Sequence, residues 1–146
     1  MNYGKSIGLY KKTGVETAGK LELVIMCYEK TIHFLMQAKD HFKKNELENK
    51  ARKMQKAMDI IRELQSCLNL DEGGQIAKNL DSIYIYLTKR LLQGDIEKDL
   101  TVFDEAINIM SELKEAWEGI ASEGENRADS MTDSSSIMTN TAQIAA

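Results

Sequence analysis

The chain has 146 residues, of which 42% are hydrophobic and 29% charged, and its formal net charge is −4. This length and apolar content predict one domain with a real core and exclude a chain that is disordered throughout. The lack of proline and the nine glycines disfavour a β-sandwich or barrel, and the acidic balance disfavours a dedicated nucleic-acid binder. Two cysteines are too few for a disulfide scaffold.

Residues 1–16 form a polar leader that three glycines interrupt. Tyr3, Ile7 and Tyr10 recur there at spacings of four and three, which is typical of one or two helical turns with an apolar face. We therefore expect a short capping segment, and the alternative is a frayed terminus. No apolar run approaches the ~20 residues that cross a membrane, and the leader lacks the apolar region of a signal peptide. We expect a cytoplasmic protein without stable membrane insertion.

Four segments after the leader have the apolar spacing of amphipathic helices. The first covers 20–44, the second and third lie on either side of the break at 71–74, and the fourth ends where the composition becomes rich in Ser, Thr and Asn. Four helices joined by short loops predict an all-α fold, an antiparallel four-helix bundle over 17–121. The polar segment 122–146 is predicted to be a disordered tail.

Local signals predict where these helices begin and end. Asn45, with Glu48 three residues later, is typical of the N-cap of the second helix. Gly94 is suited to the left-handed conformation that ends a helix, so we expect the third helix to stop there. Asp95 would then cap the fourth helix, whose main apolar stripe would begin at Ile96.

No catalytic or metal-binding constellation accompanies these helices. A di-iron site in a bundle needs a Glu-x-x-His pair on each of two helices, whereas His33 and His41 both lie on the first helix. Cys27 and Cys67 lie among apolar neighbours, and a hairpin closed near residue 45 places their thiols within about one helical turn of each other. We interpret them as reduced core thiols. We expect no enzymatic activity, no metal and no cofactor.

Charge is unevenly distributed along the chain. Residues 39–56 contain seven basic and three acidic side chains, whereas residues 95–125 contain ten acidic and two basic ones. A local basic patch for nucleic acid is one interpretation of the first segment. The other, which we favour, is a solvated bundle surface of mixed charge, because Phe42 is the one aromatic residue interleaved with these bases.

The apolar faces of the first and fourth helices are wider than a single core-facing stripe requires. Such a surplus indicates that the bundle packs or binds an additional helical segment, and the eight methionines suit an adaptable groove. Six apolar residues are predicted to lie mainly in the core, and they are Met54, Ile61, Leu80, Leu87, Ile107 and Trp117. The flanking rows give our predicted groove residues, which are Leu23, Met26, Cys27, Phe34, Ile85, Val102 and Ile109.

Several pieces of the sequence resemble, in order and spacing, the flagellin-specific secretion chaperones of the FliS family. These pieces are Y-x4-VETA at 10–18, L-x2-M-x-YE at 23–29, LNLDEGGQIA-x-NL at 68–80, IY-x-Y at 83–86 and ELKEAW at 112–117. The resemblance covers about residues 7–120. It implies a chaperone that binds the C-terminal segment of flagellin in the cytoplasm, prevents premature polymerisation and presents the subunit to the cytoplasmic domain of the flagellar type III export gate.

The resemblance also implies roles for residues near the N-terminus. Ile7 and Tyr10 match a segment that packs on the bundle, is displaced or rearranged by cargo and contacts the export gate. Val15, in the first matching piece, joins the predicted groove residues. Two alternatives stay open. One is an adapter bundle that dimerises or binds another amphipathic helix, and the other is a nucleic-acid binder that uses residues 39–56.

Overall fold

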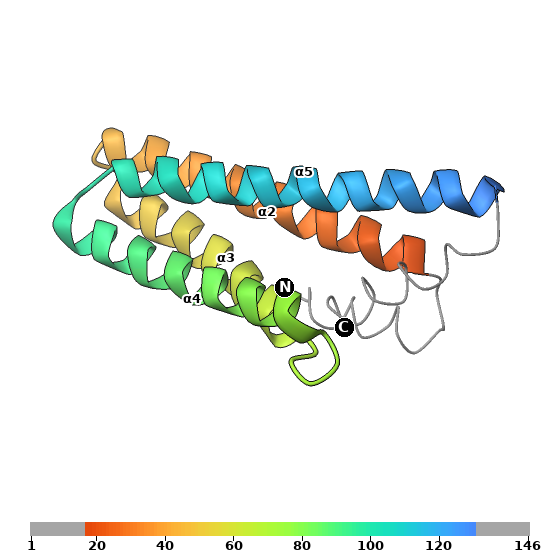
Figure 1. Cartoon of the computed structure of the whole chain (residues 1–146). Coiled ribbons are helices and arrows are strands. Elements are labelled where there is room, and N and C mark those ends of the chain that lie inside the picture. The colour runs from red at the N-terminus through yellow and green to blue at the C-terminus, as the bar shows by residue number, and fades with distance from the viewer. Residues whose placement is uncertain (1–16, 131–146) are drawn as a thin grey trace.

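The computed structural model describes residues 17–130, and every element within that range is a helix. The helices are α2 (Thr17–Lys43), α3 (Leu47–Ser66), α4 (Gly74–Glu97) and α5 (Thr101–Ser130). Consecutive helices run in opposite directions, so the α2–α3 and α4–α5 connections lie at one end and the α3–α4 connection at the other (Figure 1). The predicted all-α, antiparallel four-helix bundle is confirmed.

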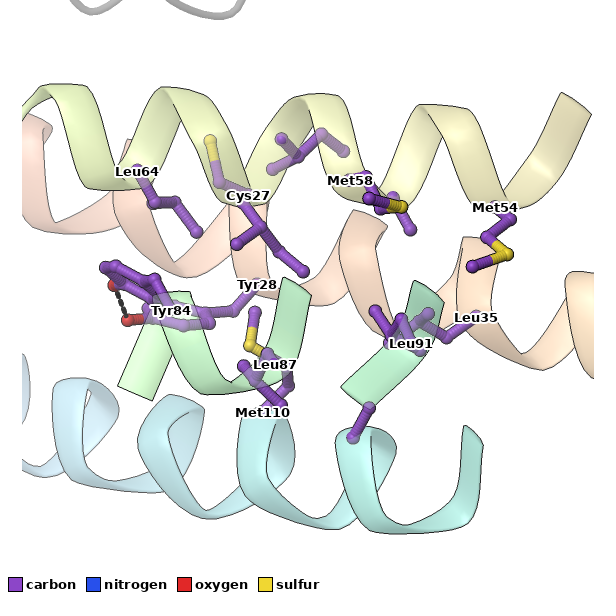
Figure 2. Packing of buried hydrophobic residues seen from close by; sticks show 14 of the residues in the cluster. Cys27, Tyr28, Leu35, Met54, Met58, Leu64, Tyr84, Leu87, Leu91 and Met110 are labelled. Carbon is purple, nitrogen blue, oxygen red and sulfur yellow. Dashed lines mark hydrogen bonds between the residues drawn. The ribbon is translucent and has the colours of Figure 1, made fainter. Parts of the chain in front are cut away.

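Helix α2 is the central element of the bundle. It packs against both α3 and α5, and these two contacts are more extensive than those that α4 makes with α3 and α5. The interior is formed by buried side chains from all four helices, for example Tyr28, Leu64, Leu87 and Met110 (Figure 2). Five of the six predicted core residues are buried, and Ile107 is half-buried and packs against the same cluster.

The predicted N-cap of α3 is wrong. Asn45 has a positive φ of 58°, and its backbone N–H donates to the Phe42 carbonyl at 3.0 Å, so it ends α2 instead of starting α3. Glu46 occupies the N-cap position without a side-chain capping bond. Its carboxylate instead lies 2.9 Å from Nδ1 of His41 on the last turn of α2. Asparagine tolerates the left-handed conformation better than most residues, which explains its place here.

The predicted boundary between α4 and α5 is also wrong. Helix α4 continues past Gly94, and the left-handed residue that follows it is Lys98, with φ 58°. Asp95 lies inside α4 and its carboxylate pairs with the Lys50 ammonium of α3. Asp99 takes the expected role at α5, where its Oδ1 accepts from the backbone N–H of Thr101 at 3.0 Å. Ile96 is 81% exposed on the last turn of α4 and is not part of α5.

Packing explains why Gly94 does not end the helix. A Cβ built on Gly94 would lie 2.7 Å from the Cβ of Val102, closer than two such atoms approach in proteins. The glycine therefore allows the start of α5 to cross closely over α4. At its other end α5 continues to Ser130, beyond the predicted domain boundary at residue 121. Residues 1–16 and 131–146 lie outside the described residues.

Folding brings the basic and acidic segments of the chain together. Lys39 Nζ lies 2.5 Å from a carboxylate oxygen of Asp104, and Lys50 pairs with Asp95. Both lysines belong to the basic segment 39–56 and both acids to the acidic segment 95–125. Some of the basic side chains of one segment therefore form ion pairs with acidic side chains of the other, across helices of the bundle.

Candidate binding groove between α4 and α5

A groove of about 410 Å³ lies between α4 and α5. This volume falls within the usual range of ligand and peptide-anchor sites. Its lining is mostly apolar and combines one face of each helix, with Ser82, Ile83 and Tyr86 from α4 and Ile109, Glu112 and Leu113 from α5. Residues three or four apart share a helix face, so each helix contributes neighbouring turns to the groove.

Helical spacing sets the form of the groove. Ile83 and Tyr86 are three apart on α4, and Ile109 and Leu113 are four apart on α5. The three aliphatic side chains are half-buried and pack against the core cluster, whereas Tyr86 is 44% exposed. The groove therefore has a firm aliphatic floor and an accessible aromatic ring at its rim.

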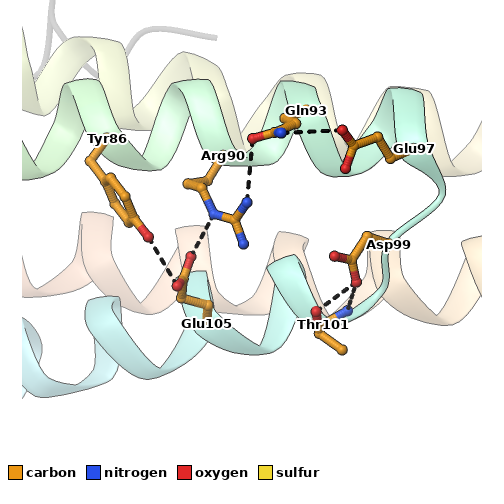
Figure 3. A network of polar contacts seen from close by, with 7 residues as sticks. All are labelled: Tyr86, Arg90, Gln93, Glu97, Asp99, Thr101 and Glu105. Carbon is orange, nitrogen blue, oxygen red and sulfur yellow. Dashed lines mark hydrogen bonds and ion pairs between the residues drawn. The ribbon is translucent and has the colours of Figure 1, made fainter.

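A polar network extends from this rim along α4 (Figure 3). The Tyr86 hydroxyl donates to Oε2 of Glu105 at 3.0 Å, and Nε of Arg90 donates to Oε1 of the same carboxylate at 3.0 Å. The hydrogen bond from Arg90 lowers the pKa of Glu105; burial opposes this shift, and the weaker effect of the Tyr86 bond lowers the pKa as well. Glu105 in turn raises the pKa of Arg90. The carboxylate is therefore ionised at neutral pH and held by two donors from α4.

The predicted groove residues do not come together in one place. Ile109 lines the groove, and Ile85 is exposed on the neighbouring face of α4. Met26 is 44% exposed, but it lies on α2. Leu23, Cys27 and Val102 are buried. Ile7, Tyr10 and Val15 lie outside the described residues.

Phe34 is half-buried where α2 meets α3, away from the α4–α5 groove. The ammonium groups of Lys53 and Lys56 lie 5.7 and 5.5 Å from the centroid of its ring. Both distances are within the range of a cation–π interaction. Phe34 therefore packs at the boundary between α2 and α3 and does not line the α4–α5 groove.

Neither Cys27 nor Cys67 forms a disulfide in the described part of the chain, and Cys27 lies in the core. Burial raises the pKa of the Cys27 thiol to about 11, and the nearby Cys67 raises it further in the same direction. One residue further along α2, the Tyr28 hydroxyl shares a buried hydrogen bond with that of Tyr84 (Figure 2). Burial raises the pKa of both tyrosines, so both phenols are neutral at physiological pH.

Sequence reasoning missed most of the groove lining. Tyr86 and Glu112 were not assigned, although both lie within pieces of sequence that carry the family resemblance. Leu113 follows Ile109 by four residues in the same apolar row, so extending that row by one turn would have found it. The spacing shows which residues share a face, but it does not show which neighbouring helix that face meets.

Within residues 17–130, no group of three or more His, Cys, Asp or Glu side chains is arranged to hold a metal ion. None of the helices from α2 to α5 is long and apolar enough to cross a membrane. The described part of the chain does contain a mostly apolar groove between α4 and α5.

The sequence of the chain is similar to known proteins. The family model for the flagellar protein FliS matches residues 3–124. A flagellar secretion chaperone FliS of Vibrio cholerae serotype O1 is 34% identical over 125 residues, which cover 83% of this chain and 92% of the relative. The FliS chaperone of Bacillus subtilis is 29% identical over 119 residues, covering 81% and 88%. FliSB of Pseudomonas aeruginosa is 27% identical over 121 residues, covering 80% and 96%.

Proposed function

Because this chain belongs to the FliS family of flagellar secretion chaperones, we propose that it binds the C-terminal segment of flagellin in the cytoplasm. In this proposal the chaperone covers the apolar surface through which flagellin polymerises and then hands the subunit to the cytoplasmic domain of the export gate. The family is one of chaperones and not of enzymes, so binding and release are the whole of the activity.

The observation that supports a binding site is the apolar groove between α4 and α5. Ile83, Ile109 and Leu113 form its floor, and an amphipathic helix laid along α4 and α5 would bury its apolar stripe against them. The exposed side chain of Ile85 extends the apolar surface beyond the rim. A cargo segment that folds on this surface gains about 25 cal/mol for each Å² of apolar area it buries, against the cost of its ordering.

The other predicted residues have different places in this proposal. Cys27 and Val102 are buried, so they support the bundle beneath the surface and do not touch cargo in the described conformation. Met26 offers a second exposed apolar contact on α2. Ile7 and Tyr10 are proposed to cover the groove when cargo is absent and to contact the export gate during transfer.

Calorimetric titration with a peptide of the flagellin C-terminal segment from the same organism tests this function. We expect a one-to-one complex with a clearly negative heat-capacity change, and little loss of affinity in high salt because apolar contacts dominate. Ile109→Ala should weaken binding at least about fivefold, the loss expected on truncating an anchor worth more than ~1 kcal/mol.

Ile96→Ala is the matched control, because Ile96 is 81% exposed and lies outside the groove. It should bind cargo with wild-type affinity. Circular dichroism would show that both variants are folded. If the folded wild-type chain does not bind the flagellin segment, the proposed function is wrong. If both isoleucine variants lose affinity equally, the groove is not the binding site.

A further inference from the structure

The polar network beside the groove restrains a side chain that would otherwise be free. Tyr86 is 44% exposed at the groove rim, where a tyrosine ring usually exchanges between rotamers. Its hydroxyl nevertheless donates to Glu105 Oε2 at 3.0 Å across the gap between α4 and α5. The ring is therefore attached at both ends, to the α4 backbone and to a side chain of the opposite helix (Figure 3).

Glu105 can restrain Tyr86 because its own carboxylate is restrained. Its second oxygen accepts from Nε of Arg90, one turn after Tyr86 on α4, at 3.0 Å. Arg90 also donates from Nη1 to the side-chain oxygen of Gln93 at 3.3 Å, and Gln93 donates to Glu97 at 3.2 Å. The guanidinium is thus oriented by further residues of α4, and it fixes the carboxylate that receives the phenol.

A role in stability alone does not account for this arrangement. The Arg90–Glu105 pair is about one-third exposed, and exposed ion pairs contribute little to the free energy of unfolding. The hydrogen bond from Tyr86 is also accessible to water, so water can replace it at small cost. The two bonds instead fix the position of the Tyr86 ring relative to the aliphatic floor of the groove.

We propose that Glu105 is a positioning residue that holds the Tyr86 ring at the groove rim in the orientation that receives the apolar face of a cargo helix. This inference rests on the proposed function. Tyrosine is a common anchor in interfaces because it offers a large contact area with few rotatable bonds. An anchor already held in its bound orientation loses less conformational freedom when cargo arrives, and affinity rises accordingly.

The test is a double-mutant cycle on the full chain, titrated with the flagellin C-terminal peptide. Glu105→Ala and Tyr86→Phe should each weaken binding about two- to tenfold, the cost of ordering one freed side chain. The double variant should bind no more weakly than either single variant, because both changes break the same bond. Asp104→Ala is the matched control: it removes one negative charge from the adjacent position of α5, where Asp104 pairs with Lys39.

A second readout follows the ring itself without cargo. The χ1 rotamer populations of Tyr86, measured from NMR Hα–Hβ couplings of the free chain, should spread over more rotamers in Glu105→Ala and stay unchanged in Asp104→Ala. Unchanged rotamer populations in Glu105→Ala, or a Glu105→Ala variant that binds cargo like the wild type while Tyr86→Phe does not, would overturn the positioning role and leave cargo binding intact. A wild-type chain that does not bind the peptide would overturn both proposals.

Discussion

At the scale of single residues, Gly94 shows how tertiary packing overrides a local signal. Its sequence context suits the end of a helix, yet it lies inside α4 because Val102 of α5 occupies the space where a side chain would be. The helix continues for another turn, and Lys98 adopts the left-handed conformation in its place. The prediction that Gly94 ends the helix is therefore wrong, because this position needs glycine for close contact between helices and not for backbone freedom.

This explanation predicts opposite effects for two glycine substitutions. Gly94→Ala should destabilise the chain, because overpacking strain of about 1–3 kcal/mol exceeds the ~1 kcal/mol that alanine gains in a helix. Gly119→Ala, on α5 with open space around its Cβ position, should stabilise by up to ~1 kcal/mol. Urea unfolding followed by circular dichroism measures both. A neutral or stabilising Gly94→Ala would contradict the close crossing of α4 and α5.

The two cysteines should differ in reactivity. Burial and the nearby Cys67 hold the pKa of Cys27 at about 11, whereas Cys67 is only partly buried at the C-terminal end of α3. In the folded chain, iodoacetamide at a pH of about 8 should therefore modify Cys67 first and leave Cys27 protected, since the thiolate is the reactive form. Both should react in denaturant. Peptide mass mapping that finds Cys27 modified first would show that the α2 core is more open than described.

At the scale of elements, the apolar spacing predicted the number, order and approximate extent of the helices, because each helix must bury one face. Their ends were predicted less well. Aspartate is a common N-cap residue, but the carboxylate of Asp95 forms an ion pair with Lys50 of α3 instead. The lining of the groove was predicted only in part for the same reason. Val102 and Ile109 occupy one apolar row of α5, but this row meets different neighbours along its length. Val102 is therefore buried, whereas Ile109 lines the groove.

Asp99, at the start of α5, is a site where pH should affect the stability of the fold. Hydrogen bonds from the Thr101 side chain and backbone lower the pKa of Asp99. A carboxylate whose folded-state pKa is depressed stabilises the fold above its ordinary pKa of ~3.9, and this contribution is lost as pH falls through the lowered value. Asp99→Ala should therefore lower the urea midpoint at neutral pH, and the difference from wild type should shrink on acidification.

The control for this prediction is Asp99→Asn. Its side-chain oxygen still accepts a hydrogen bond at the start of α5, so the midpoint at neutral pH should remain close to that of the wild type. Because asparagine does not titrate there, its midpoint should fall less steeply with acid. Equal acid sensitivity of all three chains would assign the pH dependence to other carboxylates.

At the scale of the whole molecule, the four helices differ in how tightly they pack and in how much apolar surface they expose. Helix α2 is packed on both sides by α3 and α5, and the ion pairs Lys39–Asp104 and Lys114–Glu29 join α2 to α5 along that contact. Helix α4 is packed less extensively and contributes exposed apolar side chains, including Ile85, Tyr86 and Leu92. Helix α2 thus forms a tightly packed core with α3 and α5, and the exposed apolar surface of α4 and α5 is where we propose that an additional helix packs.

Isoleucine methyl NMR tests most directly whether flagellin occupies the groove between α4 and α5, as we propose. The flagellin C-terminal peptide would be titrated into the full chain labelled at the isoleucine methyl groups. We expect the methyl signals of Ile83 and Ile109 to shift and saturate at a one-to-one ratio, while that of Ile60, buried in α3, keeps its position. Saturable binding that shifts other methyl signals and leaves Ile83 and Ile109 unchanged would contradict it.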